Sequence, residues 1–208
     1  EKLGRMKPGE SVKDFVGPLG TPSEMGRFGV VTMVGGGLGV PPLYPQAKAL
    51  RKLGNTVVSV IGARTTDLLV FEEEMRAVSD ELHVATDDGS KGFKGFVTNL
   101  LRSLIERGPK PDRVIAVGPA IMMKAVSDVT RPFKIKTIVS LNSIMVDATG
   151  MCGACRVSVA GRTRFTCVHG PEFDGHQVDF EELMARLRTY LEQEKSSLRR
   201  YQESQRGA

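Results

Sequence analysis

Short apolar, β-branched segments alternate with helical segments through the middle of the chain, and this alternation constrains the fold more than any other feature. Most of the strand segments are almost continuously apolar, as strands covered on both faces are. The pattern predicts a five-stranded parallel, doubly wound α/β sheet with helices on both faces. The predicted strands are 28–34, 56–61, 82–85, 113–117 and 134–139, and the predicted helices are 44–53, 68–78, 97–105 and 120–129.

The composition is that of an ordinary globular protein and argues against several functional classes. Of the 208 residues, 40% are hydrophobic and 25% are charged, so the chain can bury a sizeable core without disulfide bonds. The net charge of +5 is spread along the chain and only 6% of residues are aromatic, which argues against a nucleic-acid-binding surface. The longest apolar runs fall well short of the roughly 20 residues that a membrane span needs.

The chain divides into four predicted parts. Residues 1–26 resemble the last strand and exit loop of a larger domain, and include a turn at Gly17-Pro18-Leu19-Gly20. Residues 27–140 carry the alternating pattern and form the predicted nucleotide-binding domain. Residues 141–178 interrupt that pattern with all three cysteines and many glycines, and residues 179–208 are predicted to form a helix and a charged tail.

Two local patterns lie in the second half of the chain. Segments 156–159 and 163–166 alternate in polarity around Ala160-Gly161, which predicts a β-hairpin. From Asp179 to about Tyr201 the spacing predicts one helix. Its apolar face is formed by Phe180, Leu183, Leu187 and Leu191.

A glycine-rich loop follows the first predicted strand. Gly35, Gly36, Gly37 and Gly39 precede a helix, so backbone N–H groups and a helix N-terminus can approach a phosphate there. Loops of this kind at the carboxyl end of a parallel strand bind nucleotides. Val40-Pro41-Pro42 replaces the third glycine of the dinucleotide fingerprint, and a tight turn without a ligand is the alternative interpretation.

Three further loops follow strands at the same predicted edge. Thr86-Asp87-Asp88-Gly89 follows the third strand and Gly118-Pro119 follows the fourth, and both favour a nucleotide site. Arg64 follows the second strand, where NAD and NADP are distinguished, and an arginine can pair with a 2′-phosphate. The alternative for Arg64 is an ordinary surface cation.

The three cysteines form the second candidate site. Their odd number excludes a closed disulfide framework and favours a reducing, cytoplasmic location. Asp147, Cys152, Cys155 and Cys167 reproduce the spacing of a [2Fe–2S] site with aspartate at the first position. His169 is the rival fourth ligand, because a Cys3His set suits a structural zinc. The alternative function is therefore a nucleotide-binding module with a zinc knuckle.

Together these segments resemble members of the ferredoxin–NADP reductase superfamily that carry a C-terminal [2Fe–2S] cluster. The resemblance favours the small subunits of ferredoxin:NADP oxidoreductases and sulfide dehydrogenases over the electron-transfer subunits of dihydroorotate dehydrogenases, because the latter carry cysteine where this chain has Asp147. The segments that carry it are Gly17 to Gly20, Val34 to Val40, Thr86 to Ser90, Val117 to Pro119, Ser140 to Asp147, Gly150 to Arg156, Cys167 and Gly170 to Phe173.

The resemblance implies an electron-transfer subunit of an NAD(P)-dependent flavin and iron–sulfur oxidoreductase. It implies that Gly36, Gly37 and Gly39 hold the nicotinamide nucleotide, with NAD(H) favoured at this subunit. It further implies that Asp87-Asp88-Gly89 borders the flavin–nicotinamide site, and that Asp147 and the three cysteines hold the cluster. Gly17 to Gly20 belongs to the cofactor-binding residues implied in the same way.

The same resemblance implies cofactors and partners beyond this chain. An FAD-binding β-barrel precedes the nucleotide domain in such proteins, and its Arg-x-Tyr-Ser/Thr motif does not occur in this sequence. We therefore expect a C-terminal fragment, with FAD held mostly by the missing barrel. The expected partner is a larger, glutamate-synthase-like flavoprotein subunit, contacted through residues 141–178 and the C-terminal helix, with ferredoxin as a further partner.

Overall fold

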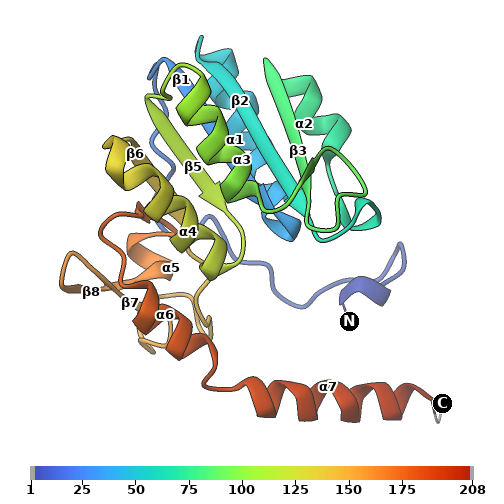
Figure 1. Cartoon of the computed structure of the whole chain (residues 1–208). Coiled ribbons are helices and arrows are strands. Elements are labelled where there is room, and N and C mark those ends of the chain that lie inside the picture. Colours follow the sequence, from blue (N-terminus) through green and yellow to red (C-terminus); the bar gives the residue numbers. More distant parts are fainter. Residues whose placement is uncertain (1–2, 207–208) are drawn as a thin grey trace.

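The computed structural model describes residues 3–206 and is built around one seven-stranded sheet (Figure 1). The strand order is β4-β3-β2-β1-β5-β6-β9, and every neighbouring pair is parallel except β6 and β9. The strands are β1 (Val30–Gly36), β2 (Thr56–Ala63), β3 (Glu81–Thr86), β4 (Phe93–Lys94), β5 (Arg113–Val117), β6 (Lys136–Ser140) and β9 (Glu172–Asp174).

The parallel α/β fold is confirmed, and the expected number of strands is wrong. The five expected strands are β1, β2, β3, β5 and β6. The sheet is extended by β4, which has two residues, and by β9, which has three and runs antiparallel. Segments this short are not long enough to show a periodicity.

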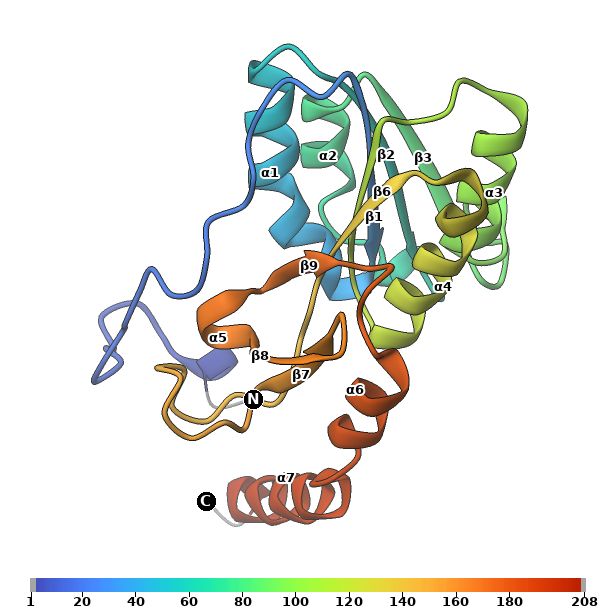
Figure 2. The same ribbon diagram turned by 90° about the vertical axis from the view of Figure 1, so that its left-hand side faces the viewer.

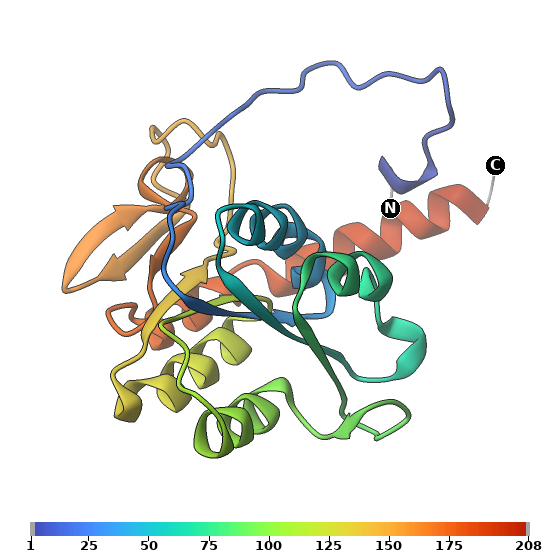
Figure 3. The same cartoon turned by 90° about the horizontal axis from the view of Figure 1, so that it is seen from above.

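Helices cover both faces of the sheet, as Figure 3 shows from above. Helices α1 (Val40–Lys52) and α2 (Glu72–Val78) pack together on one face, and α3 (Val97–Arg107) and α4 (Ala120–Thr130) pack together on the other. The burial of strand β1 on both faces explains why its sequence is almost continuously apolar. Val31 and Met33 belong to the core beneath α1, whereas the neighbouring Val34 belongs to the core on the other face.

The strand register brings the carboxyl ends of the parallel strands to one edge. Gly35 of β1 pairs with Val117 of β5, and the carboxyl end of β5 lies beside that of β6. Because α1 follows β1 on one face and α4 follows β5 on the other, the topological switch point of the sheet, called here the β1–β5 crevice, lies between these two strands. Such a change of direction is where doubly wound sheets bind ligands.

The cysteine-containing segment forms a small unit beside β6 (Figure 2). The predicted hairpin is confirmed, with β7 (Arg156–Val159) paired to β8 (Arg162–Phe165). Ala160 and Gly161 both have positive φ, 51° and 69°, as a two-residue hairpin turn requires. The short helix α5 (Thr166–His169) follows, and β9 then returns the chain to the main sheet.

The strand expected within residues 1–26 is absent from the described residues 3–29, which contain only a 3-10 turn at Leu3–Arg5. A strand forms only where a neighbour supplies hydrogen bonds, and the extended residues 10–19 lie exposed. Residues 24–28, at the end of this segment, contact the folded domain. Glu24 pairs with the buried Arg113, whose guanidinium lies 3.5 Å from the centre of the Phe28 ring.

The single helix expected from Asp179 is in fact two helices, α6 (Phe180–Leu187) and α7 (Leu191–Arg206). Phe180 and Leu183 are buried, but Leu191 and Leu198 are each more than 40% exposed. The helix therefore breaks where the apolar contacts with the domain end, and α7 extends away from the sheet (Figure 1). Among the described residues, no helix combines the length and apolar character needed to cross a membrane.

Candidate functional site

The glycine loop packs directly on the end of β5. A Cβ atom at Gly39 would stand 2.1 Å from the carbonyl oxygen of Val117, so only glycine fits there without moving backbone. A Cβ at Gly35 would stand 2.8 Å from Val40 Cγ2. Gly37 has φ +54°, a left-handed conformation that glycine adopts at little cost. The glycine loop and the Gly118-Pro119 loop therefore pack against each other at the β1–β5 crevice.

Met122 of α4 borders the same crevice and was not predicted. A Cβ at Gly36 would stand 2.4 Å from its sulfur, and one at Gly118 would stand 2.7 Å from its terminal methyl carbon. Pro119 caps the N-terminus of α4, and α1 begins directly after Gly39. Two helix N-termini thus begin at this edge, where their positive dipole ends favour an anion.

Arg64 and the Asp87-Asp88-Gly89 turn lie together at another part of the edge. The backbone N–H of Asp88 donates to the Arg64 carbonyl at 3.2 Å, and that of Asp87 donates to Ala63 at 3.2 Å. The strand order places these loops on the opposite side of β1 from β5 and the cysteine segment. The structure therefore does not bring Asp87-Asp88-Gly89 together with Gly118-Pro119.

The Gly17-Pro18-Leu19-Gly20 turn lies against the segment that follows the third cysteine. The Thr21 N–H donates to the carbonyl oxygen of Gly170 at 2.6 Å, and the Thr21 hydroxyl donates to Val168 at 3.1 Å. A Cβ atom at Gly20 would clash with the carbonyl oxygen of Gly170. Glu172 adds a link that the sequence did not reveal, because it accepts from both Ser23 and Gln46 of α1.

Cys155 and Cys167 form one pair of sulfur donors. Their Sγ atoms lie 3.2 Å apart and both residues are buried. Burial is the main cause that raises the pKa of the Cys167 thiol, with a further contribution from the neighbouring Cys155. The hairpin between them explains the pairing, since Thr166 donates to the Cys155 carbonyl through its N–H and its hydroxyl.

Asp147 and Cys152 form a second pair on the adjacent loop. One Asp147 carboxylate oxygen accepts from the Thr149 N–H and the other from the Cys152 N–H, each at 2.9 Å. These backbone hydrogen bonds, that of Thr149 first, hold the pKa of Asp147 below its usual range. The Cys152 sulfur is exposed and accepts from the Ala154 N–H at 3.5 Å.

Three thiolates and one carboxylate are donors that suit an iron–sulfur cluster. Among residues 3–206, no three His, Cys, Asp or Glu side chains are arranged to hold one ion. The four expected ligands instead lie on two adjoining segments: Cys155 and Cys167 with their sulfur atoms in contact, and Asp147 with Cys152 on the neighbouring loop. The rival ligand His169 is engaged locally, because its Nδ1 accepts from the Phe165 N–H at 2.9 Å.

Comparisons with known proteins give matches over both candidate sites. Residues 33–128 match the model of the oxidoreductase NAD-binding domain. Residues 142–179 match the model of the iron–sulfur cluster binding domain of dihydroorotate dehydrogenase B. The two matched segments contain the glycine loops and the cysteine pairs, respectively.

Individual relatives cover most of the chain. An electron transfer subunit homolog of dihydroorotate dehydrogenase B from Thermotoga maritima is 52% identical over 96% of this chain and 70% of its own length. The electron transfer subunit from Bacillus caldolyticus is 40% identical over 85% of this chain and 68% of its own. The solved structure of an NADH-dependent reduced ferredoxin–NADP oxidoreductase, studied for flavin-based electron bifurcation, is 50% identical, with a TM-score of 0.89 over 96% of this chain and 72% of that one.

Proposed function

We propose that this chain, which belongs to the family of dihydroorotate dehydrogenase B electron-transfer subunits, passes electrons toward a larger flavoprotein. The electrons pass between NAD(P)H, FAD and a [2Fe–2S] cluster. The chain is an electron-transfer subunit with an NAD-binding domain and an iron–sulfur-binding domain.

The cluster is assigned to Asp147, Cys152, Cys155 and Cys167. Cys155 and Cys167 would hold the cluster from a buried position, where their sulfur atoms already meet. Asp147 and Cys152 would hold it from the exposed loop. When bound, the cluster supplies one-electron chemistry, and its potential depends on ligand type and on hydrogen bonds to sulfur. The backbone N–H of Ala154 is one such donor.

The nicotinamide nucleotide is assigned to the crevice between β1 and β5. Gly35, Gly36, Gly37 and Gly39 approach its phosphates from one side, and Gly118-Pro119 borders it from the other. The nicotinamide end points toward β5, β6 and the cysteine segment, and the adenosine end toward β2 and β3. On this assignment Arg64 and Asp87-Asp88-Gly89 border the adenosine end, and Asp87-Asp88-Gly89 does not border the flavin–nicotinamide site as the resemblance implied.

FAD and the protein partner are assigned from the family. Gly17-Pro18-Leu19-Gly20 borders the flavin, since this turn lies against the segment after Cys167. Most of the FAD site is assigned to the FAD-binding β-barrel that the resemblance implies. The partner is a glutamate-synthase-like flavoprotein, with ferredoxin as a further electron carrier. Three free thiol groups suit the reducing cytoplasm.

One observation carries this proposal: the glycine crevice and the cysteine segment begin at neighbouring strand ends. β5 lies between β1 and β6, and β6 leads directly into the segment that carries the cluster ligands. A nucleotide and a cluster held there lie at the same carboxyl edge of the sheet. Electron transfer between cofactors requires that they lie near each other. The protein's role in such chemistry is to position the cofactors.

Two variants of the anaerobically reconstituted chain test both sites. Gly39→Val is expected to lose NAD⁺ binding in calorimetry while the iron content stays that of the wild type. Cys155→Ser is expected to lose iron while NAD⁺ binding persists. Unchanged iron in Cys155→Ser contradicts the cluster assignment, and unchanged NAD⁺ binding in Gly39→Val contradicts the crevice assignment.

A further inference from the structure

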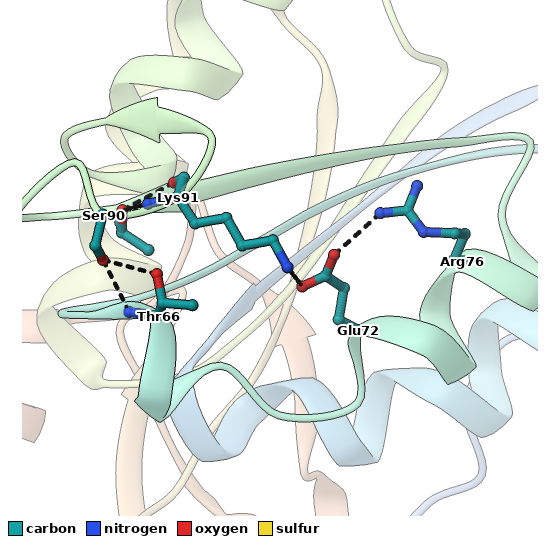
Figure 4. Close-up of polar contacts among 6 residues, drawn as sticks. Thr66, Glu72, Arg76, Ser90 and Lys91 are labelled. Atoms are coloured by element: carbon teal, nitrogen blue, oxygen red, sulfur yellow. Dashed lines mark hydrogen bonds and ion pairs between the residues drawn. The ribbon is translucent and has the colours of Figure 1, made fainter.

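The loops that follow β2 and β3 are joined into one rim at the carboxyl edge (Figure 4). Thr66 donates to the Ser90 hydroxyl oxygen through its backbone N–H at 2.9 Å and through its own hydroxyl at 2.8 Å. Ser90 in turn donates to Asp88 at 2.7 Å. With the backbone hydrogen bonds from Asp87 and Asp88, these contacts fix the two loops relative to each other.

Glu72 holds two cations at this rim. Its carboxylate lies 2.7 Å from Lys91 Nζ, from the loop after β3, and 3.0 Å from the Arg76 guanidinium, one turn further along α2. Figure 4 shows Glu72 between the two cations. The Glu72 side chain is only 14% exposed, whereas Lys91 and Arg76 are 44% and 55% exposed. The acid is thus enclosed and the cations face solvent.

The rim as a whole is acidic. Segments 64–76 and 87–92 contain six acidic side chains, Asp67, Glu72, Glu73, Glu74, Asp87 and Asp88. They contain three basic ones, Arg64, Arg76 and Lys91. A phosphate monoester carries a charge between −1 and −2 at neutral pH, so this surface repels it unless the cations are free to bind.

We propose that Glu72 is the residue that makes this chain select a nucleotide without a 2′-phosphate. The inference rests on the proposed nucleotide site, because that site places the adenosine ribose at the ends of β2 and β3, where doubly wound sheets distinguish NAD from NADP. Glu72 engages Lys91 and Arg76, two of the three cations of this rim that could otherwise pair with a 2′-phosphate, and leaves Arg64 as the third. Glu72 is a specificity residue and takes no part in the transfer of electrons.

The test measures the affinities of NAD⁺ and NADP⁺ by calorimetry with the full chain. The wild type is expected to bind NAD⁺ more tightly. Glu72→Gln frees both cations and is expected to raise the NADP⁺ to NAD⁺ affinity ratio about tenfold, which corresponds to about 1.4 kcal/mol. Lys91→Gln leaves the Glu72 carboxylate less neutralised, so the rim repels a 2′-phosphate more strongly and the same ratio is expected to fall. This variant keeps the test valid if Glu72→Gln does not fold.

Glu106→Gln is the matched control, since it removes the same charge from an exposed position of α3 outside the rim. Its affinity ratio is expected to equal that of the wild type. A ratio that stays unchanged in both Glu72→Gln and Lys91→Gln, while NAD⁺ still binds, overturns this inference and leaves the crevice assignment standing. A wild-type chain that binds neither nucleotide overturns the crevice assignment as well.

Discussion

The sulfur atoms of Cys155 and Cys167 lie 3.2 Å apart, although the two residues are twelve positions apart in the chain. The hairpin β7–β8 produces this contact, because Cys155 directly precedes its first strand and Cys167 follows its second. The pairing of the two thiols therefore depends on a small piece of secondary structure with a two-residue turn.

A substitution that stabilises the turn between β7 and β8 tests its geometry. Ala160 has φ 51°, a conformation that costs most residues about 1–2 kcal/mol but suits asparagine followed by glycine. Ala160→Asn is expected to stabilise the chain by about 0.5–1 kcal/mol, measured by urea unfolding. A destabilised variant contradicts the assigned turn geometry.

The two rival ligand sets are separated by a pair of substitutions. Asp147→Ala removes the only carboxylate of the proposed set, so we expect loss of the cluster or its conversion to another form, seen as altered visible absorption and iron content. His169→Ala is expected to keep the cluster and to lose about 1 kcal/mol of stability, because the Phe165 N–H loses its acceptor. The reverse outcome favours the Cys3His zinc site.

Gly39→Ala tests the close approach of the β1 and β5 loops. The added methyl group collides with the Val117 carbonyl oxygen, so we expect a loss of about 1–3 kcal/mol in stability and weaker NAD⁺ binding. Gly54→Ala is the comparison, because it adds strain at φ +84° with 3.8 Å to the nearest atom of Arg27. It should lose stability while NAD⁺ binds as in the wild type.

His176 predicts a pH dependence of stability. Burial, followed by the neighbouring Arg131 charge, lowers the pKa of His176 below its usual 6.5. The unfolded chain therefore takes up a proton at higher pH than the folded chain, so stability falls as the pH drops below about 6.5. Denaturant unfolding at several pH values is expected to show this fall for the wild type. His176→Gln is expected to flatten it, and an identical pH profile in both proteins excludes His176 as its source.

The sequence predicted the features that depend on local pattern. The five long strands were visible because both of their faces are covered, so that Val31, Met33 and Val34 are all buried. The hairpin was visible from Ala160-Gly161, and the ligand spacing from the cysteines themselves. Each of these signals lies within one continuous stretch of the sequence.

The features that the sequence did not reveal depend on contacts between distant segments. β9 has three residues and exists because β6 offers an edge. The strand expected before residue 27 is absent, because the described chain gives it no partner. The helix after Asp179 breaks where its contacts with the domain end. Glu72 and Lys91 stand nineteen positions apart, and only the parallel arrangement of β2 and β3 makes them neighbours.

The central claim is that Asp147, Cys152, Cys155 and Cys167 hold a [2Fe–2S] cluster. The most direct test is to purify the chain anaerobically and to measure iron, acid-labile sulfide and zinc together with the visible spectrum. We predict about two irons and two sulfides per chain, as this cluster type contains, with absorption that dithionite bleaches. A colourless chain with one zinc, or one that takes up neither iron nor sulfide on anaerobic reconstitution, would contradict the claim.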